Sequence, residues 1–354
     1  MRKPYFKWPQ VSSIYESFSP IFHLISLCLP ITLPTTRHTT RSRPTVIQIV
    51  QFSVNILVLV YMYVMTTIGG IQFTQLNSDS EIMMTGMKMM SAFGVFYILS
   101  IYIVFRLLQK KIRSFIDRLD ELDRKIHILS GDFNYTEEFQ FFLILTTSMI
   151  IGCFTVAIIQ IIVIDIDSFL LRIFITIFTY AINNSGVGLI LLMTLFIIGI
   201  RTRFMSINAT IANLLTNPKS SNGEIDRVIT QLAKYHSELI DLVEDINRTL
   251  IAYITVDLMG IFLFNLMNSL AFFRLTVLND THGWTMRIVN ILWGLYQANC
   301  SLLAIGFAHS MRKQCKLTGK VIHKVLNGEQ SVEKAIVFKS HVITLQESKK
   351  YEEA

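Results

Sequence analysis

The chain has 354 residues, of which 52% are hydrophobic and only 16% are charged. A water-soluble domain of this length rarely combines so much apolar composition with so few charges, so the composition indicates a membrane protein. The net charge of +7 does not indicate nucleic-acid binding, because the basic residues are spread over separate segments between apolar stretches. Cys28, Cys153, Cys300 and Cys315 lack the spacing of a disulfide framework or a zinc site, so we expect no metal and no cofactor.

Residues 1–44 are predicted to form a cytoplasmic arm with a short membrane-dipping segment. The first apolar run, residues 21–33, is too short to span a bilayer and contains Pro30. It also begins after twenty mostly polar and aromatic residues, unlike a cleavable signal peptide. A buried helix of a soluble domain is the alternative interpretation.

Six longer apolar stretches follow this arm. A helix needs about 20 apolar residues to cross a hydrocarbon core about 30 Å thick, because its backbone amides must be satisfied within the segment. Residues 45–308 are therefore predicted to form an all-α, polytopic membrane bundle. The predicted spans are residues 46–65, 84–108, 141–164, 169–200, 250–273 and 288–307.

Lysine and arginine residues fall almost wholly into alternate connections between these spans. The N-terminal arm, the second and fourth connections and the segment 309–354 are basic, whereas the first connection, 67–80, has no basic residue. Basic side chains near membrane ends are retained on the cytoplasmic side. We therefore predict that the N-terminus and the C-terminal segment are both cytoplasmic.

The two long cytoplasmic connections, 109–139 and 201–249, are predicted to be helical. In residues 111–129 and 224–250, apolar side chains recur at intervals of three and four, with charged residues between them. The second pattern includes His236 and continues into the fifth span, and the stretch 217–223 breaks the chain before it. We expect these helices to extend the spans and pack together, and lying flat on anionic lipid is the alternative.

The sequence carries no enzymatic motif: GxSxG, HExxH, a Walker lysine loop and paired carboxylates within a span are all absent. Asp257 is the one acidic residue well inside a predicted span, in its inner third. A carboxylate in a membrane is costly to ionise without a partner. We favour structural pairing with a neighbouring Arg or Lys over a role in conduction or gating.

Amide and aromatic side chains concentrate in the predicted outer halves of the last three spans. If they converge on one cavity, they would suit a small neutral ligand. For any one of them, hydrogen bonding between helices is the simpler explanation. The candidate pocket residues are Tyr180, Asn183, Asn184, Asn265, Asn268, Phe272, Trp293, Tyr296 and Gln297.

The predicted topology also sorts the Asn-x-Ser/Thr triplets. Asn279 lies in an outside loop, which makes it the expected glycosylation site. Asn134, Asn208 and Asn247 begin further triplets, but their segments are predicted to be cytoplasmic.

Four stretches of the chain resemble insect gustatory receptors. Residues 19–34 are similar to the family's pre-membrane segment, which contains a Pro-containing turn. Residues 203–211 are similar to a family pattern that consists of Phe, any two residues, Leu-Asn and a later Leu, and this chain has Ile at both leucine positions. His236, Leu239 and Asn247 match the family's His-x-x-Leu and later Asn, and residues 318–346 resemble the cytoplasmic stretch before its last helix. The resemblance covers residues 18–346.

The resemblance implies a subunit of a ligand-gated cation channel in the plasma membrane of chemosensory neurons. Four identical or related subunits would surround one pore, with a small-molecule tastant bound in the outer half of each helix bundle. His236 and Asn247 would act in gating or structure where cytoplasmic helix ends form subunit contacts. Membrane lipid is a further expected partner, and nucleic acid is not.

One departure from the family is the seventh span, which should carry a Thr-Tyr pair followed by Gln-Phe and is not found in this sequence. We therefore expect six of seven spans, in an incomplete gene model, a splice form or a subunit that does not conduct alone. A six-span solute transporter is the alternative function, although internal repeats and mid-span prolines are absent. A G-protein-coupled receptor is disfavoured by the cytoplasmic N-terminus and by the lack of Asp-Arg-Tyr after the third span.

Overall fold

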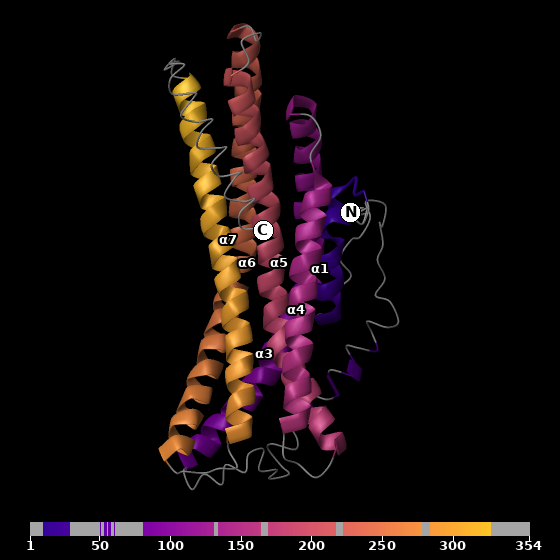
Figure 1. The fold of residues 1–354 in the computed structure, drawn as a ribbon, viewed down its shortest axis with the longest axis vertical. Coiled ribbons are helices and arrows are strands. Elements are labelled where there is room, and N and C mark those ends of the chain that lie inside the picture. The colour runs from indigo at the N-terminus through magenta and orange to yellow at the C-terminus, as the bar shows by residue number, and fades with distance from the viewer. Residues whose placement is uncertain are drawn as a thin grey trace, which may run out of the picture. The chain divides into compact units, whose positions relative to one another are not determined.

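The regular secondary structure is α-helical throughout the described residues (Figure 1). The computed structural model describes residues 10–28, 50, 53–54, 56–57, 60, 81–130, 134–163, 169–216, 222–277 and 284–326. The predicted all-α class is therefore confirmed for this part of the chain. The helices are α1 (Ile14–Cys28), α3 (Glu81–Ser130), α4 (Tyr135–Val163), α5 (Phe169–Thr216), α6 (Asn222–Val277) and α7 (Trp284–Leu326).

Four of these helices are at least twice as long as a bilayer requires. Helix α6 has 56 residues, which at about 1.5 Å per residue makes it roughly 80 Å long, against a hydrocarbon core of about 30 Å. Helices α3, α5 and α7 contain 50, 48 and 43 residues. Helix α5 ends at Thr216, two residues before Pro218, because the residue preceding a proline is disfavoured in the α conformation.

Four helices among the described residues are long and apolar enough to cross a membrane. Their candidate spans are Tyr135–Ile162, Val187–Leu214, Arg227–Leu263 and Ile291–Ile322, which lie in α4, α5, α6 and α7. The predicted span 84–108 lies within α3, and the predicted span 46–65 falls mostly outside the described residues. Six spans and a cytoplasmic N-terminus therefore stay predictions.

The chain divides into two compact units. Unit 1 comprises Met1–Arg113, Thr136–Met193 and Leu250–Leu303, and unit 2 comprises Ser114–Tyr135, Thr194–Thr249 and Ala304–Ala354. Helices α3, α5, α6 and α7 each contribute one segment to each unit. Unit 2 contains most of the segments that the charge pattern assigns to the cytoplasm.

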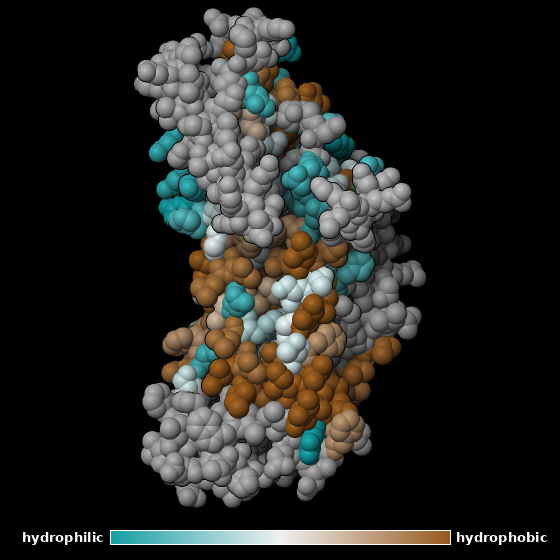
Figure 2. Space-filling model, in the orientation of Figure 1, coloured by the Kyte–Doolittle hydropathy of each residue, from teal (hydrophilic) through white to brown (hydrophobic). Residues whose placement is uncertain are grey.

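Unit 1 exposes many large apolar side chains. On α4, the exposed residues Ile144, Ile151, Phe154, Ile158 and Ile162 recur at spacings that keep them on one face of the helix. Figure 2 shows apolar side chains, drawn in brown, gathered over much of the face that it presents. Soluble proteins rarely expose so many contiguous apolar side chains, whereas lipid-facing helices require them.

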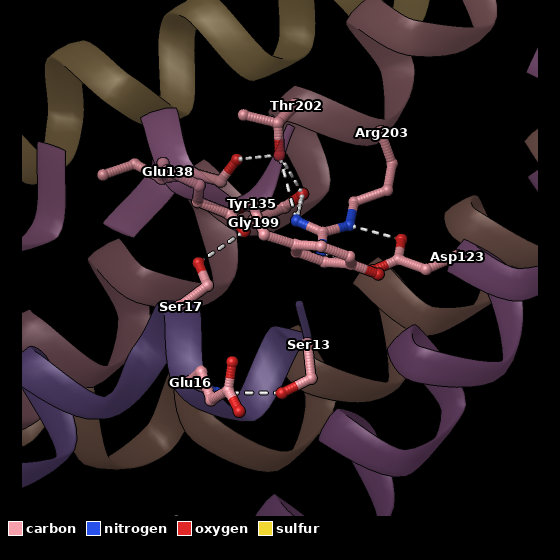
Figure 3. A network of polar contacts seen from close by, with 10 residues as sticks. Ser13, Glu16, Ser17, Asp123, Tyr135, Glu138, Gly199, Thr202 and Arg203 are labelled. Atoms are coloured by element: carbon pink, nitrogen blue, oxygen red, sulfur yellow. Dashed lines mark hydrogen bonds and ion pairs between the residues drawn. The ribbon is translucent and has the colours of Figure 1, made fainter. Parts of the chain in front are cut away.

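Helix α1 packs against α4 within unit 1. The Ser17 hydroxyl donates a hydrogen bond to Glu138 Oε2 at 2.8 Å, with both side chains buried (Figure 3). The rings of Phe18 and Phe142 meet edge to face with their centroids 5.4 Å apart. The apolar run that begins at residue 21 therefore belongs to a helix that starts at Ile14. Its position in the membrane stays a prediction.

Unit 2 contains most of the two amphipathic helices predicted from residues 111–129 and 224–250, and only residues 111–113 and 250 belong to unit 1. The first is the C-terminal part of α3, and the second is the N-terminal part of α6, which continues without a break into the predicted fifth span. The buried face of α6 includes Leu242, whereas the neighbouring Val243 is half-buried. The buried apolar residues on these two segments are Ile112, Phe115, Ile116, Leu119, Leu122, Ile126, Ile225, Ile229, Leu232, Leu239, Leu242, Ile246 and Leu250.

Candidate functional site

Three of the candidate pocket residues come together on α7, in unit 1. Trp293 is fully buried, and its indole N–H donates a hydrogen bond to Gln160 Oε1 on α4 at 2.8 Å. The half-buried ring of Tyr296 meets the Trp293 ring nearly at right angles, with the centroids 5.9 Å apart. Gln297, the next residue, is buried. The structure therefore provides an aromatic and amide cluster between α4 and α7.

Asn265 lies where α6 approaches α7. Its Nδ2 donates a hydrogen bond to the carbonyl of Ile261, one turn earlier on the same helix, at 2.9 Å. A Cβ placed on Gly294 would overlap Asn265 Oδ1. Glycine at position 294 therefore makes room for the Asn265 amide, a common use of small residues where membrane helices pack closely.

A methyl group at this contact should be costly. We expect Gly294→Ala to lower the free energy of unfolding by about 1 kcal/mol, because Asn265 must rotate away from the Ile261 carbonyl. The control is Gly306→Ala on the same helix, where nothing lies within 4 Å of the added Cβ. That change should raise stability by about 0.5–1 kcal/mol through helix propensity. Thermal unfolding of the purified chain in detergent distinguishes the two variants, and equal shifts would contradict this packing.

The other candidate pocket residues lie on helices whose side chains are described only in part. Tyr180, Asn183 and Asn184 belong to α5, and Asn268 and Phe272 belong to α6, but their side chains fall outside the described structure. The same is true of the Asp257 side chain on α6, and Asn279 lies wholly outside the described residues.

Gln160 is a member of the cluster that the sequence analysis missed. Its side chain is buried and accepts the hydrogen bond from the Trp293 indole. The only other amide side chain in α4 is that of Gln140, near the start of the helix. Cys153, Val156 and Val289 pack with Trp293 in the same buried cluster. An isolated amide in an otherwise apolar span was the available sign of a partner on another helix.

The most strongly bound charges lie in unit 2. The Arg203 guanidinium donates two hydrogen bonds to the Asp123 carboxylate, from Nε to Oδ1 at 2.7 Å and from Nη2 to Oδ2 at 2.6 Å (Figure 3). The two side chains are 0% and 1% exposed. The Tyr135 hydroxyl also donates to Asp123 Oδ2 at 3.0 Å, and Arg203 Nη1 donates to the Gly199 carbonyl at 2.8 Å. Such additional hydrogen bonds are what a buried ion pair needs to offset its desolvation.

The positions of this pair in the sequence explain its burial. Asp123 follows Leu119 by four residues and precedes Ile126 by three, so it occupies a core position of the amphipathic pattern. Arg203 likewise stands four residues before the buried Ile207. Both residues lie in segments that the charge pattern assigns to the cytoplasm, and Arg203 also begins the stretch 203–211 that resembles gustatory receptors. A charge at a core position was the sign that a buried partner was required.

His236, a predicted gating or structural residue, lies in a packed environment in unit 2. Its ring meets the Phe204 ring with the centroids 5.4 Å apart, and Nε2 lies 3.3 Å from the Cys315 carbonyl on α7. The ring also lies against Gly319 of α7, where an added Cβ would be 3.8 Å from the His236 Cε1, an ordinary van der Waals contact. Asn247, the other residue of that prediction, is exposed on α6. Their roles stay predictions.

Asn208, from the stretch that resembles gustatory receptors, joins α5 to α7. Its side chain is buried, and Nδ2 donates to Gln314 Oε1 at 3.0 Å. Gln314 in turn accepts a hydrogen bond at its backbone carbonyl from the Thr318 hydroxyl at 3.0 Å. The motif residue therefore forms a polar contact inside unit 2.

Exposed ion pairs join α3 to α6 at the surface of unit 2. Arg118 pairs with Asp245, and Lys125 Nζ donates to Glu238 Oε2 at 3.1 Å. Hydrogen bonds to Glu121 and Glu238 raise the pKa of Lys125, which keeps its ammonium group charged. Each such pair contributes about 0.2–1 kcal/mol at most. Arg118 and Lys125 are thus balanced by carboxylates on α6.

Comparison with known proteins identifies the family. No curated protein matches the chain significantly. The profile of the 7tm chemosensory receptor family matches residues 18–336, a range that runs from α1 to beyond the end of α7. Members of this family are membrane receptors and not enzymes. The chain belongs to the 7tm chemosensory receptor family, of the insect gustatory receptor type.

Proposed function

We propose that this receptor is a subunit of a ligand-gated cation channel that detects a small-molecule tastant at the plasma membrane of chemosensory neurons. Family membership supports a receptor over a solute transporter. The observation that carries the channel proposal is that α3, α5, α6 and α7 each supply unbroken helix to both units. A ligand that contacts the unit 1 segment of one of these helices can therefore shift the population of arrangements of the same helix in unit 2.

The proposed ligand site lies in unit 1, around Asn265, Tyr296 and Gln297. Trp293 is fully buried and hydrogen-bonded to Gln160, so it would hold Tyr296 in place, while the half-buried Tyr296 ring would contact the ligand. Amide groups and aromatic rings suit a small, weakly polar molecule. Tyr180, Asn183, Asn184, Asn268 and Phe272 are the further proposed members of this site.

Four identical or related subunits are proposed to assemble around the pore through the unit 2 helices. The Asp123–Arg203 pair and the Asn208–Gln314 contact would keep unit 2 in one packing arrangement. The coupling free energy between ligand binding and pore opening would then be about 1–3 kcal/mol, the usual size for coupling between two sites.

Electrical recording tests the proposal. The chain would be expressed in oocytes, alone and with a second receptor of the family, during application of sugars, alkaloids and amino acids. We expect an inward cation current with at least one tastant, and a tenfold or larger rise in the required concentration for Tyr296→Ala. The control is Phe154→Ala, since Phe154 is 59% exposed on the apolar face of α4. Saturable uptake without any current would favour the transporter instead.

Glycosylation tests the proposed orientation. We expect Asn279 to carry a glycan, so that Asn279→Gln abolishes the mobility shift caused by glycosidase treatment. Asn208 is a poor reporter because its side chain is buried, so a chain with a glycan there would not fold. The exposed Asn134 is the informative control, and a glycan there would reverse the proposed topology.

A further inference from the structure

Helix α7 has an unusual distribution of charge. Its 43 residues include no aspartate or glutamate. Arg312, Lys313, Lys316 and Lys320 are all exposed, and at about 100° per residue they fall within a sector of roughly 100° on the helix surface. The exposed His309 lies in the same sector. These residues define the basic face of α7.

The basic face is opposite the packed side of the same segment. Gln314, Thr318, Val321 and Ile322 are buried, and by the helical repeat they lie on the other side of α7. The four cations therefore point away from the interior of unit 2. None of the ion pairs among the described residues includes them, in contrast to Arg118 and Lys125 on α3.

Two simpler explanations do not account for this face. Cations stabilise a helix C-terminus only within its last turn, whereas Lys320 lies six residues before the end of α7 at Leu326. Retention of basic residues in the cytoplasm explains their sign, but not their alignment on one face or the lack of any acidic residue.

The same face of α7 is apolar in its preceding turns. Ile291, Leu295, Leu302 and Ile305 are exposed and share the angular sector of the basic residues. Along one side of a single helix, exposed apolar side chains thus give way to exposed cations between Ile305 and His309. A lipid monolayer presents the matching sequence of environments, acyl chains followed by headgroups.

We propose that the basic face of α7 binds the headgroup of an anionic membrane lipid that carries several phosphates, such as a phosphorylated inositol lipid. Clusters of at least four cations just beyond a membrane span are typical of such sites, and the basic face begins five residues after the predicted span 288–307. The basic face from 312 to 320 extends about 12 Å along the helix, further than the headgroup layer of roughly 5–7 Å. A headgroup that projects beyond this layer can contact the whole row. The proposal rests on the proposed orientation, which places the basic face at the cytoplasmic leaflet.

Lipid binding by the purified full-length chain tests this proposal. Native mass spectrometry in detergent would compare short-chain phosphatidylinositol bisphosphate, phosphatidylserine and phosphatidylcholine. We expect the bisphosphate lipid to bind best and the triple variant Lys313→Gln, Lys316→Gln, Lys320→Gln to weaken that binding at least tenfold. The matched control removes three exposed cations of α6, with Arg227→Gln, Lys234→Gln and Arg248→Gln, and should change binding less than twofold.

Further measurements distinguish the loss of a headgroup site from the loss of folding and from binding of an acidic protein. Replacing the three lysines by arginine should keep the binding, and all variants should elute as the wild type in size exclusion. Equal losses in both triple variants, or equal binding of phosphatidylserine, would overturn the proposal. Preferential binding of a polyglutamate peptide would assign the face to an acidic protein and overturn it as well.

The lipid measurement does not depend on channel activity. A chain that gives no tastant current, yet prefers the bisphosphate lipid through the three lysines, would refute the proposed channel and support the lipid site. A glycan on Asn134 would refute the orientation, and with it a lipid of the cytoplasmic leaflet.

Discussion

Replacing Asp123 by alanine should lower the free energy of unfolding by about 3–5 kcal/mol, because the Arg203 guanidinium would stay buried without its carboxylate. Arg203 donates two hydrogen bonds to Asp123, at 2.7 and 2.6 Å, and both side chains have almost no exposure. The remaining hydrogen bonds from Arg203 Nη1, to the Gly199 carbonyl and the Thr202 hydroxyl, cannot compensate a full charge. Thermal unfolding in detergent, with the folded fraction read by size exclusion, measures the loss.

Two further variants separate the charge from the volume of the side chains. Asp123→Leu combined with Arg203→Met replaces the pair by apolar groups of similar size and should restore stability to within about 1 kcal/mol of wild type. Tyr135→Phe removes one hydroxyl donor to Asp123 and should cost only about 1 kcal/mol. Wild-type stability of the single Asp123→Ala variant would show that water reaches Arg203.

Trp293→Ala should be almost as destabilising, at about 3–4 kcal/mol, because it leaves a cavity in the contact between α4 and α7. Trp293 is fully buried, touches Tyr296 and donates a hydrogen bond to Gln160. Lipid tails are as apolar as the helix interior, so the loss comes from packing and hydrogen bonding rather than from transfer to water. Thermal unfolding of the purified variant measures it.

Variants at and near this position test the cause. Trp293→Phe keeps an aromatic ring and loses the indole donor, so about half of the alanine effect should remain. Leu295→Ala, two residues away on the exposed face of α7, should have little effect, since that side chain is 62% exposed. Equal losses for Trp293→Ala and Leu295→Ala would contradict the packing described for Trp293.

The helices themselves were predictable because their apolar residues follow the helical repeat. The spacing in 111–129 and 224–250 depends only on which residues face a common core, and the structure places most of those residues in unit 2. The amphipathic helix 111–129 was expected to extend the span 84–108. One helix, α3, runs through both, because Gln109 and Lys110 favour a helix and join them.

Contacts between helices were beyond what the sequence pattern can specify. Periodicity shows that Trp293 and Gln160 lie in apolar helices, but not that one is the hydrogen-bond partner of the other. The pattern also does not show that Asp123 and Arg203 are buried, because charged side chains are almost never buried unless they are paired. Whether Asp123 meets Arg203 depends on how α3 and α5 align along each other, and the sequence pattern of one helix does not determine that alignment.

The buried Asn208 has a consequence for biosynthesis. Asn208-Ala209-Thr210 is an acceptor triplet whose Asn and Thr side chains are both buried in the folded receptor. A chain inserted in the wrong orientation would expose this triplet to the glycosylation machinery before folding. The attached sugar would then block the contact of Asn208 with Gln314. An error of insertion would become a failure to fold, so that a wrongly oriented receptor would be retained and degraded before it reached the cell surface.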